Sequence, residues 1–217
     1  SQFLDKPGLQ HWIAVKRIFR YLNGTRDEGI TFSKSEAANV IEGWCDSDWA
    51  GDLDNRRSTT GYVFKMANGP ISWKSRRQRT TALSSTEAEY MAATEATKEA
   101  LWLRSLMLEI GLPQQQPTVI NEDNQGCILL SQTSKDHQRT KHIDIKHHFI
   151  KDHINKSVVL KYLRTEEMTA DILTKALNAP KFKKHKESIL GQVNSAGTSS
   201  EEIMSPASGS VGGALEP

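Results

Sequence analysis

The sequence predicts an α/β fold built on a single mixed β-sheet. Three short strand-like segments follow one another closely between residues 40 and 74, which is typical of an antiparallel meander. A helix-length segment then separates them from two further strand-like segments, at 118–122 and 158–163, each followed by helical sequence. This order of elements predicts a five-stranded sheet, with three antiparallel strands followed by parallel ones, flanked by helices.

The N-terminal part of the chain predicts a helix and a short strand ahead of the sheet. Over residues 9–23 the apolar side chains recur with the period of a helix, the cations lie elsewhere, and Gly24 provides a stop. Residues 29–34 are a candidate short strand.

The meander itself is predicted at 40–49, 61–66 and 71–74. A polar loop at 52–58 joins the first two strands. Between the second and the third, Asn68-Gly69-Pro70 is a turn signal. Connections this short favour antiparallel neighbours.

The longest predicted helix covers residues 85–110. Ser85 or Thr86 can cap its start, and Gly111 and Pro113 mark its end. After it we expect a strand at 118–122, a short helix at 125–131, a helix at 142–154, a strand at 158–163 and a last short helix at 169–177.

The composition is that of a globular protein with a polar tail. Of 217 residues, 37% are hydrophobic and 25% charged, and residues 191–217, rich in Ser, Gly, Ala and Pro, are expected to be disordered. No run approaches the ~20 apolar residues of a membrane span, and no signal-peptide pattern opens the chain. Cys45 and Cys127 are too few for a disulfide framework. We therefore expect an intracellular protein with reduced thiols and no membrane contact.

Charge is segregated along the chain, although the net charge is only +2. Residues 73–79 hold four cations and no acid, and residues 135–156 are rich in Lys, Arg and His. Carboxylates gather elsewhere. With this separation, the basic patches can bind phosphates and the acidic clusters can bind metal ions.

Two acids stand at the ends of predicted strands. Asp46 follows the apolar part of the first strand, and Asp123 follows the strand at 118–122. Functional groups in such sheets gather at strand ends, where a rigid scaffold meets solvent. The two carboxylates can converge if their strands are neighbours.

Glu89 lies on the core-facing stripe of the predicted long helix, whereas Glu87 points nearly opposite. A carboxylate aimed at a core needs a cation or a metal ion, because burying it alone costs several kcal/mol. The simpler interpretation is that Glu89 only complements the helix dipole. The residues that share its face are Ala92, Ala93, Ala96, Ala100, Leu103, Met107 and Ile110.

Asp171 opens the last predicted helix. A first-turn aspartate is a common feature of helix starts, so the residue alone says little about function.

Blocks of sequence in a fixed order resemble the ribonuclease H domains of copia-type retrotransposons. They cover about residues 40–180, and the ordered set is specific where each block alone is weak. Residues 7–34 resemble the segment that links reverse transcriptase to ribonuclease H in these polyproteins. The blocks include Trp44-Cys45-Asp46-Ser47-Asp48-Trp49, Ser84-Ser85-Thr86-Glu87-Ala88-Glu89-Tyr90, Asn121-Glu122-Asp123-Asn124-Gln125, Lys141-His142-Ile143-Asp144 and Thr169-Ala170-Asp171-Ile172-Leu173-Thr174-Lys175.

The resemblance implies a ribonuclease H-like fold and a division of the chain. Residues 1–38 would be the end of the reverse transcriptase or connection segment, 39–190 the ribonuclease H domain and 191–217 the tail. The implied activity is an endonuclease that hydrolyses the RNA strand of RNA·DNA hybrids during reverse transcription. Its implied partners are the hybrid and the reverse transcriptase domain of the same polyprotein, in a cytoplasmic virus-like particle or in the nucleus, with no small-molecule cofactor.

The resemblance also implies a four-carboxylate site. Asp46, Glu89, Asp123 and Asp171 match the family pattern, in preference to Asp48, Glu87 and Glu122. Four acids can hold two Mg²⁺ ions, with Mn²⁺ as an alternative, that flank the scissile phosphate in a two-metal mechanism. The chain departs from many ribonucleases H in one respect, because its loop at 164–168 contains no histidine.

Substrate contacts are expected beside the acids and on the basic run. Ser47, Asn124 and Gln125 are candidates for hydrogen bonds to the 2′-hydroxyls of the minor groove. Trp73 is interpreted as a core residue rather than a base-stacking platform. The candidates for binding phosphates are Lys74, Arg76, Arg77 and Arg79, unless that run is simply a solvated strand end.

A cluster of histidines lies at 137–153. Asp144 and His148 have the spacing of a transition-metal pair on a helix, but the segment also has the pattern of an ordinary packed helix with a basic outer face.

Two other functions remain open from the sequence. The chain can be a catalytically silent retroelement remnant that serves at most as a hybrid-binding or tethering module. It can also be an integrase-type nuclease of related fold, which the block order disfavours. Cleavage of a hybrid, as opposed to binding alone or cutting of duplex DNA, separates the three.

Overall fold

The five-stranded mixed sheet predicted from the sequence is confirmed. A computed structural model describes residues 4–34, 39–52, 54–133 and 144–191, with 144–148 described by backbone alone. The strand order is β3-β2-β1-β4-β5. β1 pairs antiparallel with β2 and β2 with β3, whereas β4 is parallel to β1 and to β5. The strands are β1 (Glu42–Asp48), β2 (Thr59–Met66), β3 (Gly69–Arg77), β4 (Thr118–Glu122) and β5 (Val158–Tyr162).

The β2–β3 hairpin turns one residue earlier than predicted. Its two turn residues, Ala67 and Asn68, have φ values of 50° and 66°. Two-residue turns with positive φ match the right-handed twist of the strands they join. Because the turn is so tight, β3 starts at Gly69 and is longer than the predicted strand.

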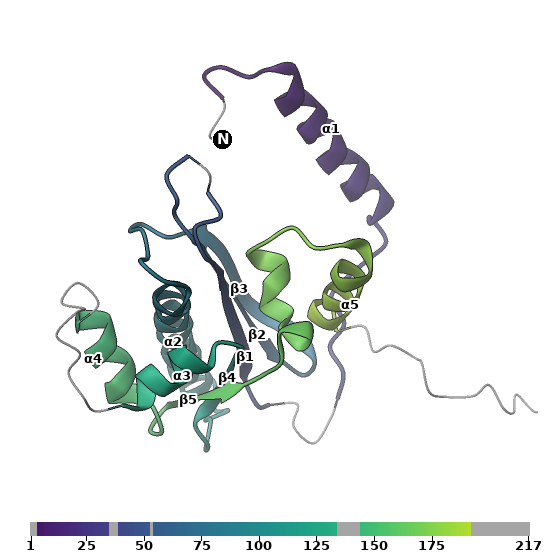
Figure 1. The fold of residues 1–217 in the computed structure, drawn as a ribbon. Coiled ribbons are helices and arrows are strands. Elements are labelled where there is room, and N and C mark those ends of the chain that lie inside the picture. The colour runs from purple at the N-terminus through teal and green to yellow at the C-terminus, as the bar shows by residue number, and fades with distance from the viewer. Residues whose placement is uncertain (1–3, 35–38, 53, 134–143, 192–217) are drawn as a thin grey trace, which may run out of the picture.

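Helix α2 (Ser85–Glu109) packs along one face of the sheet and forms the core with it. Its alanines let the helix approach the strands closely, where it contacts Tyr62 and Phe64. The cap is Ser84 and not Ser85 or Thr86, since its hydroxyl accepts a hydrogen bond from the Glu87 backbone N–H. Figure 1 shows α3 (Gln125–Gln132) and α4 (Asp144–His153) on the same side of the sheet as α2.

The other side of the sheet is covered by the C-terminal part of the described chain (Figure 1). The short helix predicted at 169–177 is present only in part, as the 3₁₀ helix η2 (Thr169–Leu173). A second 3₁₀ helix, η1 (Thr165–Glu167), precedes it. Helix α5 (Ala179–Ile189) was not predicted, although Asn178 caps it and a proline lies in its first turn.

The segment predicted as a strand at 29–34 is not one. Thr31 N–H bonds to Leu190 O and Ser33 N–H to Ala67 O, so the segment bridges two different elements and pairs with neither. Before it, helix α1 (Leu9–Gly24) buries none of its residues and projects away from the sheet in Figure 1. Among the described helices, none combines the length and hydropathy required to cross a bilayer.

Candidate active site

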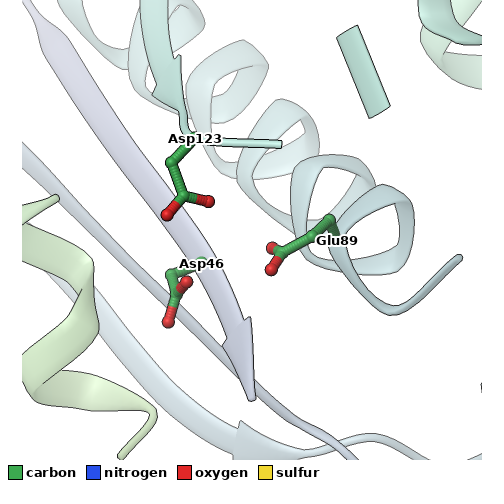
Figure 2. A group of neighbouring side chains, drawn as sticks. All are labelled: Asp46, Glu89 and Asp123. Atoms are coloured by element: carbon green, nitrogen blue, oxygen red, sulfur yellow. The ribbon is translucent and has the colours of Figure 1, made fainter. Parts of the chain in front are cut away.

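Asp46, Glu89 and Asp123 converge at one edge of the sheet. Asp46 belongs to β1, Asp123 directly follows β4, and Glu89 lies in the first turns of α2. Because β1 and β4 are parallel neighbours, their carboxyl ends meet. Each residue offers a carboxylate oxygen, and these oxygens all lie within 4.8 Å of one another. Figure 2 shows the three carboxylates pointing toward a common space.

The convergence concentrates negative charge in a buried place. Burial raises the pKa of Asp46 to about 6, against the lowering effect of Lys175 and Thr174. Burial, and then repulsion by Glu122 and Asp46, raises the pKa of Glu89 to about 11. The backbone hydrogen bond from Ser47 acts in the opposite direction and lowers the pKa of Glu89.

The three carboxylates fit a hard divalent cation. Glu89 Oε2 is buried and has no hydrogen-bond partner among the described residues. A buried acceptor without a donor is costly, and close carboxylates without a cation repel one another. An all-oxygen donor set is what Mg²⁺ and Mn²⁺ prefer. The unpartnered Glu89 oxygen and the close approach of the three carboxylates are therefore consistent with Asp46, Glu89 and Asp123 as metal ligands.

Asp171 lies next to this group but in different surroundings. Its side chain is fully buried, with Lys175 Nζ 2.8 Å from Oδ1 and Lys181 Nζ 2.5 Å from Oδ2. The set of oxygens within 4.8 Å does not include Asp171. Two lysines thus balance its charge, and its role as a fourth metal ligand stays a prediction.

Thr174 and Lys175 connect Asp171 with Asp46. The Thr174 hydroxyl donates a short hydrogen bond to Asp46 Oδ2, and Lys175 Nζ lies 3.7 Å from the same oxygen. The sequence interpretation missed both residues and Lys181. The Asp171/Lys175 spacing of four was a usable signal, because such pairs meet on one side of a helical turn.

The three acids not selected from the sequence have structural partners. Asp48 accepts a hydrogen bond from the Thr59 backbone N–H, and Glu87 from the Leu83 backbone N–H at the start of α2. Glu87 is buried rather than directed away from the protein as expected. Glu122 is fully buried behind the acidic group.

The three residues predicted to contact 2′-hydroxyls differ in their exposure and in the hydrogen bonds that they already make. Ser47 is buried next to Asp46, and its Oγ has no hydrogen-bond partner among the described residues. Asn124 caps α3, since its Oδ1 accepts from the Cys127 backbone N–H at 2.9 Å. Gln125 is exposed at the start of that helix. Their role in binding substrate stays a prediction.

The basic run surrounds a cavity of about 420 Å³ between β3 and α2. Arg77 is paired with Asp52 at 2.5 Å and Lys74 with Glu95 at 3.5 Å. Arg76 and Arg79 are exposed. The cavity is lined by Thr60, Lys74, Arg76, Arg77, Gln78, Arg79, Thr80, Met91 and Glu95.

The prediction that Trp73 is a core residue is wrong, since it is 56% exposed on the edge strand β3. His137 and His142 lie outside the described residues, as do the side chains of Asp144, His147 and His148. The loop without a histidine forms η1, where the Thr165 hydroxyl donates to Asp123 Oδ2 at 2.7 Å.

Comparisons with known proteins give relatives of one kind over most of the chain. It is 46% identical over 188 residues to the retrovirus-related Pol polyprotein from transposon TNT 1-94 of Nicotiana tabacum, covering 86% of this chain. It is 38% identical over 183 residues to the corresponding polyprotein from transposon RE2 of Arabidopsis thaliana, covering 84%. The chain spans only 14% and 12% of the length of these two polyproteins. No family model matches the chain.

Two further similarities are more limited in extent or degree. Over 103 residues the chain is 53% identical to a Plasmopara viticola protein named Secreted RxLR effector protein 161, covering 48% of this chain and 72% of that protein. The solved structure of LC11-RNase H1, isolated from compost, superimposes with a TM-score of 0.48 at 17% identity. That match covers 63% of this chain and 93% of the other.

Proposed function

We propose that this chain, which belongs to the retrovirus-related Pol polyproteins of copia-type transposons, is a metal-dependent nuclease that cuts the RNA strand of RNA·DNA hybrids. The observation that carries the proposal is the convergence of Asp46, Glu89 and Asp123 within 4.8 Å. Relatives that are transposon polyproteins support it, because reverse transcription produces a hybrid whose RNA strand must be removed.

The acidic residues would hold divalent ions beside the scissile phosphate. Asp46, Glu89 and Asp123 are the proposed ligands, with Asp171 as a fourth that is shared with the lysines. When bound, Mg²⁺ or Mn²⁺ would supply activation of the attacking water and stabilisation of the leaving oxygen.

The chain's own residues position the ligands. The Ser47 backbone N–H and the Thr174 hydroxyl hold the carboxylates of Glu89 and Asp46. On the other side of the group, the Thr165 hydroxyl holds Asp123. Three ligands fixed from β1, α2 and the end of β4 need little rearrangement on binding a cation.

Hybrid recognition is proposed to use the surfaces on either side of this site. Ser47 and Gln125 lie beside the acids and can address hydroxyls of an A-like minor groove. Lys74, Arg76, Arg77 and Arg79 line the cavity at β3 and can hold phosphates. Residues 1–38 are proposed as the end of the reverse transcriptase segment, 39–190 as the nuclease domain and 191–217 as a tail.

The test is cleavage of a labelled RNA·DNA hybrid by the purified chain with Mg²⁺. We expect RNA fragments with 5′-phosphate and 3′-hydroxyl ends, lost in Asp46→Asn and Glu89→Gln while hybrid binding is kept. Asp54→Asn, a change of an exposed acid outside the group, is the matched control. Binding by the parent chain without cleavage would instead identify a silent module, and cutting of duplex DNA would identify an integrase-type nuclease.

A further inference from the structure

The fourth acid of the proposed site already has two cations. Asp171 is fully buried, and its two oxygens lie 2.8 Å from Lys175 Nζ and 2.5 Å from Lys181 Nζ. Lys181 is held by the start of α5, where its backbone N–H donates to the Asn178 cap. Lys175 follows η2 and reaches Asp171 from the other side.

Lys175 also reaches the second carboxylate. Its Nζ lies 3.7 Å from Asp46 Oδ2, the oxygen that accepts the Thr174 hydroxyl. One ammonium group therefore lies between Asp46 and Asp171.

The charges of the site match one divalent ion better than two. Asp46, Glu89, Asp123 and Asp171 carry four negative charges when ionised, and Lys175 and Lys181 carry two positive charges. Two negative charges remain uncompensated. Because both lysines contact Asp171 or Asp46, the remaining negative charge lies mainly on Glu89 and Asp123. Glu89 also carries the buried oxygen without a donor.

We propose that Lys175 is a positioning residue that takes a cation position between Asp46 and Asp171, so that the chain alone binds one divalent ion well and a second only weakly. This inference rests on the proposed metal site. A dication placed near the ammonium would be repelled by it, and the repulsion is strong where water is partly excluded.

The side chain of Lys175 is also able to move out of its position between Asp46 and Asp171. It is 38% exposed and has the long flexible stem of lysine. If it swings into solvent, Asp171 keeps Lys181 and is not left as an unpaired buried charge. Phosphates of a bound hybrid offer an alternative partner for the released ammonium group. The second ion is then expected together with substrate.

The experiment counts bound Mn²⁺ on the full chain without nucleic acid, from the electron paramagnetic resonance signal of free Mn²⁺. The parent chain is expected to bind one ion, with a second at least about tenfold weaker. Lys175→Met and Lys175→Gln are expected to bind two ions of similar affinity. Lys175→Arg, which keeps the positive charge, should bind Mn²⁺ as the parent chain does. Lys183→Met is the matched control, because Lys183 is exposed and its ion pair is with Glu187, at 3.9 Å, and not with an acid of the site.

Two results would overturn the inference. One is a parent chain that binds two ions equally well, a measurement that needs no variant to fold. The other is unchanged Mn²⁺ binding in both Lys175 variants when circular dichroism shows them folded. Because the readout is independent of cleavage, a chain without nuclease activity can still show the change in stoichiometry. A chain that cleaves hybrids without this change contradicts the lysine role alone.

Discussion

Cys45 and Glu122 face each other directly behind the acidic group. The Cys45 thiol donates a hydrogen bond to Glu122 Oε2 across 3.2 Å, and both side chains are fully buried. Burial raises the pKa of Glu122 to about 8, and after burial itself the charge of Glu122 has the largest raising effect on the pKa of Glu89. Behind the proposed ligands there is therefore a further carboxylate, Glu122, whose ionisation opposes the fold.

This relationship predicts that the metal-free protein loses stability as pH rises. Asp46, Glu89 and Glu122 have folded-state pKa values above those of an unfolded chain, so their contribution is fully present below about pH 4 and falls as they ionise in the fold. We expect the Tm, measured by circular dichroism with chelator, to fall between pH 5 and 8.5. Glu122→Gln should reduce this fall, whereas Asp54→Asn should not. A Tm that is constant or rises over this range would contradict the argument.

Divalent ions should reverse this loss. An ion that binds only the folded state stabilises it by about 1.4 kcal/mol for each tenfold excess over its Kd. At pH 8 we expect Mg²⁺ to raise the Tm of the parent chain, and Mn²⁺ to do the same. The increase should be absent in Glu89→Gln and kept in Asp54→Asn. An equal increase in both variants would place the bound ion elsewhere.

The sheet could be predicted from the sequence because its signals are local. The short connection that carries Asn68 fixes the hairpin, and the helical face of Glu89 is set by the spacing of small residues. The edge position of Trp73 could not be derived in this way. It depends on which strand ends the sheet, and this is decided by pairing between distant segments.

The site was predictable only in part, for the same reason. Strand ends indicated Asp46 and Asp123, but their approach to Glu89 depends on the β1–β4 pairing. Lys175 was missed although its spacing of four from Asp171 was a usable signal, because such a spacing does not show that the pair faces the acidic group. Lys181 lies on α5, which the sequence interpretation did not include.

Gly61 should be needed for the contact between β2 and η2. A Cβ at this position would lie 2.6 Å from Thr174 Cγ2 and 2.9 Å from Leu173 Cβ, so η2 would have to move. Thr174 holds Asp46, and η2 carries Asp171. We expect Gly61→Ala to cost about 1–3 kcal/mol in unfolding free energy, as overpacking usually does, and to reduce hybrid cleavage further than this loss explains.

The matched control is Gly29→Ala, where a Cβ meets nothing within 4 Å. Urea unfolding and hybrid cleavage are measured on both variants. If Gly61→Ala is as stable and as active as Gly29→Ala, the packing of η2 on β2 does not position the site.

The exposed arginines of the basic run should set the salt dependence of hybrid binding. Arg76 and Arg79 line the cavity at β3 and are exposed, whereas Arg77 is partly neutralised by Asp52. Each phosphate contact releases counterions and adds about 0.9 to the slope of log K against log salt for a duplex. We expect Arg76→Ala with Arg79→Ala to weaken binding and lower this slope by up to about 2, measured by fluorescence anisotropy between 50 and 200 mM salt. Lys156→Ala is the control, because Lys156 precedes β5 at the opposite end of the sheet from the acids. An unchanged slope would mean that the basic run is only a solvated strand end, and that the hybrid crosses the protein elsewhere.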